Sequence, residues 1–265
     1  MKIMRVILLA YCCSATVQAT EVTVDAAQDT TIFQNNVNNS DGGGPGIFVG
    51  ANGTGSTRRG LISFNVSSFV PAGAIITNVQ LTLTLGLTSA GGPGSATIGL
   101  FDLTQNWGQG TNGSTATGIG GTGQGYAANP GDATWDAAFY PSTLWNNPGG
   151  DHLSSASASL LVSGTTVGTS YTWLSTPQLV ADVQGWLNTP TTNYGWELIN
   201  ADETDSNTLY GFYSSESDNA HFGGSASQVP ELEVTYTVPE PASGSLVALT
   251  ALSLSALIRP FRRRI

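Results

Sequence analysis

The sequence predicts an all-β fold, a two-sheet β-sandwich or jelly roll that carries one short helix. Most of its periodic segments are short and alternate apolar with polar residues, which is the pattern of half-buried strands. Charged residues make up only 10% of the chain, so the Lys, Glu and Arg that favour helices are scarce. Thr, Val, Gly, Ser and Asn are common instead, and they favour strands joined by polar turns.

Strands are expected wherever this alternation is clear. The clearest segment is 74–86, where Val79, Leu81, Leu83 and Leu85 recur at period two. A turn signal at 71–73 precedes it. Further strands are predicted at 21–25, 30–34, 47–50, 59–66, 96–103, 156–162, 170–174, 195–199, 209–213 and 231–237. In the last of these, Leu232 and Val234 share one face and Glu231 and Glu233 the other.

One helix is predicted, over residues 176–188. Thr176 can cap its first turn, and Pro177 suits the first helical position. Its apolar residues form one stripe at helical spacing, made by Leu179, Val180, Val183, Trp186 and Leu187. Such a stripe is typical of a face that packs on the core rather than of a binding site.

Residues 105–132 form a long glycine-rich segment with almost no aliphatic side chains. Loops of this length in a compact domain are usually functional or disordered. The aromatic residues Trp107, Tyr126, Trp135 and Trp145 lie in or near it. Two interpretations stay open: the rings cover the core as a lid, or they form a platform on which sugars stack.

The distribution of charged residues limits the kinds of ligand that the chain can be expected to bind. Between residues 6 and 258 the basic residues are Arg58 and Arg59 alone, whereas acidic residues are spread along the chain. This balance excludes nucleic acid as a partner, because phosphates require basic patches. It favours neutral glycans, or acidic ones bridged by calcium. Of the two arginines, we expect one to be buried in a structural ion pair, and the other is a candidate ligand contact.

Calcium is the metal that the sequence favours, because hard oxygen ligands are plentiful. The candidate ligands are Asp132 and Asp136 in one acidic segment and Asp202 and Asp205 in another; the alternative is that these are solvated acidic loops. No other cofactor is expected. Two histidines far apart argue against a transition-metal site. An enzyme is not predicted, because no nucleophile elbow is present and a carboxylate pair cannot be recognised without its separation.

The N-terminus has the features of a signal peptide over residues 1–19. Lys2 and Arg5 precede an apolar stretch, and Val17, Gln18 and Ala19 form a small-residue cleavage site. Both cysteines of the chain, Cys12 and Cys13, lie in this leader. The exported domain, residues 20–237, is therefore predicted to have no disulfide and no thiolate metal site.

The C-terminus, residues 238–265, has three parts. The first part is the motif Val238, Pro239, Glu240 and Pro241. The second part, residues 242–258, is uncharged and would reach ~25 Å as a helix, which is enough to span a thin bilayer core. The third part, residues 259–265, contains four arginines. This order resembles the PEP-CTERM sorting signal. The resemblance implies an exosortase-type transpeptidase as partner, a transient inner-membrane anchor through the C-terminal helix, and delivery to the cell envelope, the outer surface or the extracellular matrix.

The chain resembles the DNRLRE domain family in a series of segments taken in order: 58–66, 71–77 leading into 79–83, 182–187 followed by 195–198, 212–216 and 230–236. That resemblance implies an extracellular β-sandwich related to carbohydrate-binding modules. Asn65 departs from the Asp usual in the family at that position. We therefore expect a non-catalytic surface or exopolysaccharide-matrix protein associated with carbohydrate. A structural surface protein without a specific ligand and a polysaccharide-active hydrolase or lyase are the alternatives.

Overall fold

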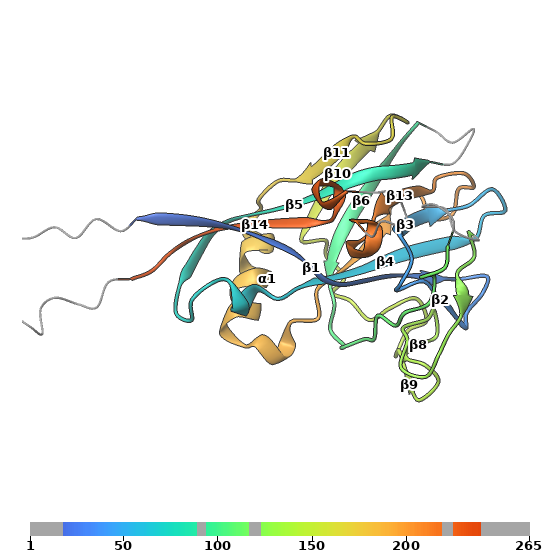
Figure 1. Cartoon of the computed structure of the whole chain (residues 1–265), viewed down its shortest axis with the longest axis horizontal. Coiled ribbons are helices and arrows are strands. Elements are labelled where there is room, and N and C mark those ends of the chain that lie inside the picture. The colour runs from blue at the N-terminus through green and yellow to red at the C-terminus, as the bar shows by residue number, and fades with distance from the viewer. Residues whose placement is uncertain (1–17, 89–93, 117–122, 219–224, 240–265) are drawn as a thin grey trace, which may run out of the picture.

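The computed structural model describes residues 18–88, 94–116, 123–218 and 225–239 (Figure 1). In this part of the chain the structure is mostly β-sheet with one α-helix, as the sequence predicts. The predicted membrane span, the arginines after it and residues 1–17 of the predicted signal peptide lie outside the described residues. No helix within the described ranges is long and apolar enough to cross a membrane.

Ten of the strands follow the predicted segments closely, whereas the short strands β2, β7, β8 and β9 were not predicted. Their bounds are β1 (Ala19–Phe33), β2 (Asn39–Ser40), β3 (Gly46–Ala51), β4 (Thr57–Phe64), β5 (Ile75–Thr88), β6 (Ser95–Asp102), β7 (Tyr126–Ala127), β8 (Ala137–Phe139), β9 (Thr143–Leu144), β10 (Ala158–Ser163), β11 (Ser170–Trp173), β12 (Trp196–Asn200), β13 (Tyr210–Tyr213) and β14 (Glu231–Thr237). The α-helix is α1 (Pro177–Asn188), and short 3-10 turns are η1 (Val66–Ser68), η2 (Pro190–Thr192), η3 (Ser215–Asp218) and η4 (Ala226–Gln228).

Strand β1 pairs with two groups of strands, which are also connected through β13 and β3, because β13 pairs with β5 and with β3, and β3 pairs with β4. Residues 19–25 pair with β14, which continues to β5 and β11. Residues 26–33 pair with β4, which continues to β12, β6 and β10. The pairing register shifts between Ala26 and Gln28, where the strand passes from one group to the other. The two short strands predicted from the sequence in this region are therefore one continuous strand with an irregularity, a common device where strands change sheets.

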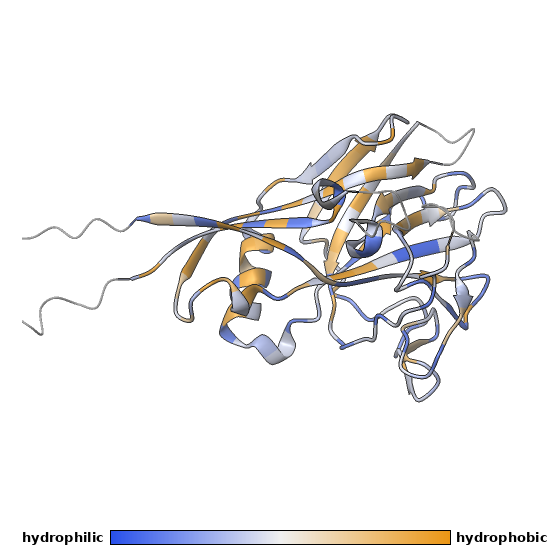
Figure 2. Ribbon diagram, in the orientation of Figure 1, coloured by the Kyte–Doolittle hydropathy of each residue, from blue (hydrophilic) through white to orange (hydrophobic). Residues whose placement is uncertain are grey.

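The main core lies between these two groups. It contains Leu81 and Val79 from β5, Ile62 from β4 and Ile98 from β6, all fully buried. Trp173 of β11 donates its Nε1 hydrogen bond to the Ile98 carbonyl at 2.9 Å, which joins the groups across the core. Figure 2 shows apolar residues along the strands and on the helix, with polar residues in many of the loops. In β14 the predicted amphipathic alternation is confirmed by its burial pattern.

Helix α1 forms as the sequence predicts. The Thr176 Oγ1 accepts a hydrogen bond from the Leu179 amide at 3.0 Å, and Pro177 begins the first turn. The predicted stripe faces the core through Leu179, Val183, Trp186 and Leu187. The Trp186 ring lies 4.4 Å, centroid to centroid, from the Trp196 ring of β12, so the helix is fixed against the strands.

A second apolar cluster covers Ile32 of β1 and Leu61 of β4, on the side of these strands that points away from the main core. The segment from 103 to 145 supplies the cover, with Leu103, Trp107, Ala133, Trp135, Ala138 and Trp145. Both Trp107 and Trp145 donate their indole hydrogen bonds to backbone carbonyls, those of Tyr194 and Thr134. The described part of this segment includes β8 and β9, which lie beside β2 in Figure 1.

The first and last strands are antiparallel neighbours. Ala19 pairs with Thr237, and the register continues to Asp25 and Glu231. The two ends of the domain therefore leave it side by side, as the left of Figure 1 shows.

Candidate functional site: a pocket between α1 and β6

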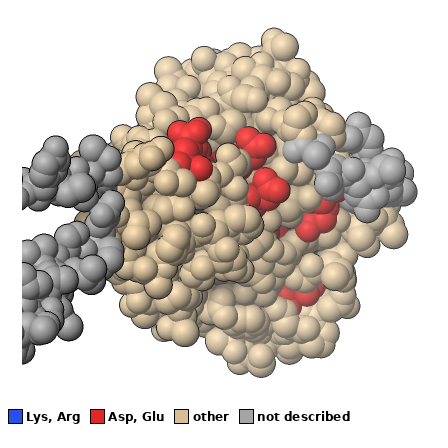
Figure 3. All heavy atoms as spheres, turned by 60° about the vertical axis from the view of Figure 1, so that its left-hand side comes forward, with Lys and Arg blue, Asp and Glu red and all other residues tan. Residues whose placement is uncertain are grey.

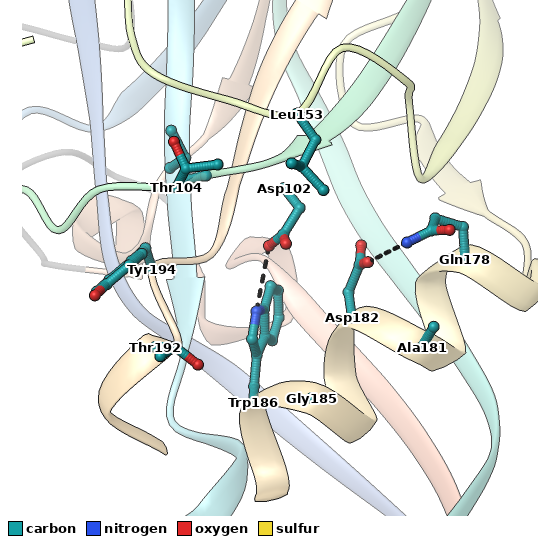
Figure 4. Close-up of a pocket in the computed structure, with 11 residues that line it drawn as sticks. Asp102, Thr104, Leu153, Gln178, Ala181, Asp182, Gly185, Trp186, Thr192 and Tyr194 are labelled. Carbon is teal, nitrogen blue, oxygen red and sulfur yellow. Dashed lines mark hydrogen bonds between the residues drawn. The ribbon is translucent and has the colours of Figure 1, made fainter. Parts of the chain in front are cut away.

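A pocket of about 430 Å³ lies between α1, the end of β6 and residues 190–194 (Figure 4). Its lining residues come from four segments that are distant in sequence: Asp102, Leu103, Thr104, Leu153, Gln178, Ala181, Asp182, Gly185, Trp186, Thr192 and Tyr194. Ligand pockets in proteins are commonly ~300–1,000 Å³, so this one has room for a small ligand.

The carboxylate of Asp182 is fixed in place on α1. Its Oδ2 accepts a hydrogen bond from the Trp196 Nε1 at 2.9 Å, and its Oδ1 accepts one from the Gln178 Nε2 at 2.8 Å. Because Trp196 is fully buried in the core, the position of this carboxylate depends on the packing of the whole domain.

The carboxylate of Asp102 faces the same pocket from the last residue of β6 (Figure 4). Among the described residues, the side chain that donates a hydrogen bond to it is Trp186, from Nε1 to Oδ1 at 3.3 Å. Burial, followed by repulsion from Asp182, raises the pKa of Asp102 to about 7, and the indole hydrogen bond opposes this rise. Asp102 therefore keeps unused acceptor capacity in the pocket, and its charge changes near neutral pH.

The remaining lining residues supply neutral polar groups and an apolar rim. Thr104, Thr192 and Gln178 are exposed, and Tyr194 is half-buried. Leu153 is 45% exposed. No Lys or Arg lines the pocket. The site is thus rich in hydrogen-bond acceptors and hydroxyls and repels anions.

Gly185 leaves one wall of the pocket open. It lies on the exposed side of α1, and a Cβ built there would meet no atom within 4 Å. Because Gly185 lines the pocket and has no side chain, a large residue at this position would occupy space at the edge of the pocket.

Both arginines predicted as candidate contacts are held by the protein itself. Arg58 is buried, donates hydrogen bonds to the carbonyls of Ser56 and Gly123 at 2.7 Å each, and lies over the Phe33 ring. It has no carboxylate partner in the described residues, and burial lowers its pKa to about 10.

Arg59 is the arginine in the ion pairs. It forms two parallel hydrogen bonds of 2.9 Å with Glu203, and its Nη1 lies 3.5 Å from the Glu197 Oε1. Its guanidinium also stacks over Trp135 and bonds the Gly149 carbonyl. Glu197 is fully buried, and burial raises its pKa to about 8 although Arg59 opposes the rise. These contacts place Arg59 in a structural network.

The predicted sugar-stacking platform is not displayed by the structure. Trp107, Trp135 and Trp145 are buried in the second apolar cluster, so their ring faces contact protein rather than solvent. Tyr126 is half-buried in the two-residue strand β7. The interpretation of these rings as a lid fits the packing, because the sheet face beneath them is apolar.

The predicted calcium ligands are not brought together. Asp132 is buried and accepts hydrogen bonds from the Asn112 side chain and the Asn129 amide, so it braces a loop. Asp136 is half-buried, and Asp202 and Asp205 are exposed. Within the ranges that the structure describes, no three Asp, Glu, His or Cys side chains are already arranged to hold a metal ion.

The sorting motif is described only in part. Val238 and Pro239 are exposed directly after β14, whereas Glu240 and Pro241 lie outside the described residues.

Sequence reasoning missed the pocket. The sequence of α1 contains one indication of it, because Gln178 and Asp182 are polar residues one turn apart on a helix whose apolar stripe was interpreted as part of the core. Asp102 could not be recognised, because the pocket residues other than Leu103 and Thr104 come from segments more than 45 residues away along the chain.

The face of the domain drawn in Figure 3 agrees with the acidic composition. Figure 3 shows separate acidic side chains on one face of the domain, without a broad basic patch. No protein-family model matches the chain, and a search of curated proteins finds no match.

Proposed function

We propose that this protein is an exported, non-catalytic cell-surface or exopolysaccharide-matrix protein that binds a neutral carbohydrate in the pocket between α1 and β6. One observation carries the proposal: carboxylate, amide and hydroxyl groups line a pocket that contains no basic residue. A sugar presents several hydroxyl donors together with an apolar ring face. Carboxylates are strong acceptors for such donors, and Leu153 and Tyr194 offer apolar surface beside them.

The proposed architecture is a two-sheet sandwich of the jelly-roll kind. The two groups of strands that share β1 and enclose the main core support it. The resemblance to DNRLRE domains, which are related to carbohydrate-binding modules, agrees with the same function.

The proposed route to the surface rests on the sequence. Residues 1–19 direct export, and an exosortase-type transpeptidase acts at Val238, Pro239, Glu240 and Pro241. Residues 242–258 hold the chain in the inner membrane until then, and the arginines that follow stay on the cytoplasmic side. Removing Arg262, Arg263 and Arg264 should impair retention of the precursor in the membrane, which cell fractionation measures. Unchanged fractionation would contradict the role of the arginines.

Binding is tested with the exported domain, residues 20–237, on an array of neutral and acidic glycans. We expect signals on neutral glycans, and loss of at least tenfold in affinity when Asp102→Asn replaces a charged acceptor in the pocket. Asp25→Asn is the matched control, because Asp25 is exposed on β1 and does not line the pocket. If no glycan gives a signal, the alternative of a structural surface protein without a specific ligand is favoured.

A polysaccharide hydrolase is the second candidate, and the two carboxylates favour it. Glycoside hydrolysis uses two acids in unlike environments, one of them with a raised pKa. Asp102, with a pKa of about 7, and Asp182, held by two hydrogen bonds, fit that description. Release of reducing ends from a polysaccharide by the wild-type domain, and its loss in Asp102→Asn, would replace the binding proposal with this one.

A further inference from the structure

A second pocket, of about 250 Å³, lies where β1 passes from one group of partner strands to the other. Amide and hydroxyl side chains make up most of its lining, and we call it the amide pocket. Its lining residues come from β1, β4, the start of η1 and the segment after α1: Ala27, Gln28, Ser63, Phe64, Asn65, Ser67, Pro190 and Asn193. No Asp, Glu, Lys or Arg is among them.

The amide pocket lies at the irregularity of β1. Ala26 pairs with Phe64 of β4, whereas Gln28 pairs with the preceding residue of β4, Ser63. Ala27 is therefore an extra residue without a partner in β4. A bulge of this kind bends its strand and changes the direction of the side chains beside it. Here Ala27 is exposed and the Gln28 side chain is half-buried, and both line the pocket.

Two side chains of the amide pocket have hydrogen-bonding capacity that the protein does not use. Ser63 is only 7% exposed, and its hydroxyl forms no hydrogen bond with the described residues. The Gln28 amide forms none within the described ranges either. The two residues are opposite each other on adjacent strands, so their side chains lie on the same face. Polar groups this far from bulk water require a partner, which a ligand could supply.

The other amides of the pocket are held in position. The Asn193 Nδ2 donates a hydrogen bond to the Phe64 carbonyl at 2.7 Å, which fixes this side chain against β4. The Ser67 hydroxyl donates to the Asn65 Oδ1 at 3.4 Å. The amide pocket therefore offers a ligand both donors and acceptors, without any charge.

Residues 190–194 form a wall that this pocket shares with the pocket between α1 and β6. Thr192 and Tyr194 line the pocket between α1 and β6, whereas Pro190 and Asn193 line the amide pocket. Asn193 has extended backbone angles, with φ −79° and ψ 96°. Successive side chains of an extended segment point to opposite sides, which explains why neighbouring residues line different pockets. The two pockets are thus separated by a single chain segment.

We propose that a neutral glycan chain crosses residues 190–194 and binds in both pockets, so that the ligand is a polymer rather than a single sugar. This inference rests on the proposed carbohydrate binding in the pocket between α1 and β6 and extends it. A sugar hydroxyl both donates and accepts, as the Ser63 hydroxyl and the Gln28 amide do. Pro190 and Tyr194 offer apolar ring surface on the two sides of the wall.

The test measures how affinity depends on the length of the sugar. Isothermal titration of the mature protein would use oligomers of glucose, mannose, galactose and N-acetylglucosamine, each from the monosaccharide to the hexasaccharide. In at least one series we expect the Kd to fall about tenfold or more with length, because contacts in a second pocket add to those in the first. The double variant Gln28→Ala, Ser63→Ala should bring the ratio of the longest and shortest oligomers' affinities close to one.

The double variant should unfold at the wild-type temperature, because neither side chain has a partner to lose. Ser67→Trp, at an exposed position of the lining, should lower the affinity ratio in the same way by obstructing the amide pocket. Gln80→Ala is the matched control, since Gln80 is a half-buried glutamine of β5 that lines neither pocket. It should keep the wild-type ratio.

Three results would overturn the inference. A wild-type Kd that is equal at every length, or a wild-type ratio in both pocket variants, would show that the glycan does not enter the amide pocket. Either result leaves the proposed binding between α1 and β6 standing. If the wild type binds no member of any series, this inference and the proposed carbohydrate binding fail together.

Discussion

Two groups of buried and half-buried acidic side chains in this domain differ in whether a positive charge lies beside them. Around Arg59, the carboxylates of Glu197 and Glu203 lie beside a guanidinium that bonds one of them twice and approaches the other. The second group is Asp29, Asp41 and Glu216, where the hydrogen-bond donors are the neutral groups of Ser215 and Gln109.

The difference shows how the chain uses Arg58 and Arg59, the two arginines among the described residues. Arg59 fastens the aromatic lid to the sheet, because it contacts Glu197 beneath and Trp135 and Gly149 in the covering segment. Among the described residues, no arginine or histidine pairs with Asp29, Asp41 or Glu216. Stability at the first group therefore comes from an ion pair within the chain, whereas stability at the second depends on protonation of the carboxylates.

The largest effect is expected from breaking the first group. Arg59→Ala removes the charge beside the fully buried Glu197 and should lower the free energy of unfolding by about 3 kcal/mol, as loss of one partner of a buried pair does. Urea unfolding at pH 7 measures this change. The double variant with Glu197→Gln should recover part of the loss. Purely additive effects of the two substitutions would contradict a direct interaction between these residues.

A pH series sharpens the comparison at the second group. Asp29 and Asp41 have pKa values of about 8 in the folded chain, above the ordinary value of 3.8. The folded state therefore binds more protons than the unfolded state between pH 4 and pH 8, so stability falls as the pH rises through this window. The Tm should drop by several degrees across this window. Asp41→Asn should flatten the drop, and a slope unchanged by Asp41→Asn would contradict this assignment.

The pocket provides a third, smaller contrast. The pKa of Asp102 is raised to about 7 by burial and by the Asp182 charge, so its ionised form reduces stability at pH 8. Asp102→Asn should raise the Tm at pH 8 by one or two degrees while it weakens glycan binding. A gain in stability together with a loss of binding would show that Asp102 serves ligand binding at a cost in stability. A fall in both would indicate a structural role.

The smallest effect is expected at Gly185 on α1. Gly185→Ala should stabilise the helix by about 0.5–1 kcal/mol, because alanine loses less backbone entropy and meets no atom within 4 Å. Gly185→Phe should fold equally well but obstruct the pocket and reduce glycan binding. Unfolding and binding curves of the two variants check this. Full binding by Gly185→Phe would place the ligand away from this pocket.

Much of the fold could be predicted from the sequence, because the strands and the helix follow local periodicity. A few neighbouring residues are enough to recognise the apolar–polar alternation in β5 and β14 and the N-terminal cap of α1. The continuity of β1 could not be predicted in this way, since the strand changes partners at Ala26 and loses its simple alternation there.

The site was harder to predict because distance along the chain hides it. Asp102 and Asp182 line one pocket only after β6 and α1 have packed, and each alone resembles an ordinary surface acid. The tryptophans around the glycine-rich segment posed the opposite problem. The residues next to a tryptophan in the sequence do not show whether its ring is exposed or buried. These rings are buried because they pack on the apolar face that Ile32 of β1 and Leu61 of β4 present.

The pairing of Ala19 with Thr237 has a consequence for engineering the domain. Adjacent antiparallel strands lie about 5 Å apart, so a linker of a few residues could join the two ends. The domain should therefore tolerate circular permutation, with new ends opened in a surface loop. A permuted chain could be tethered from a different side while its core and its pocket remain unchanged.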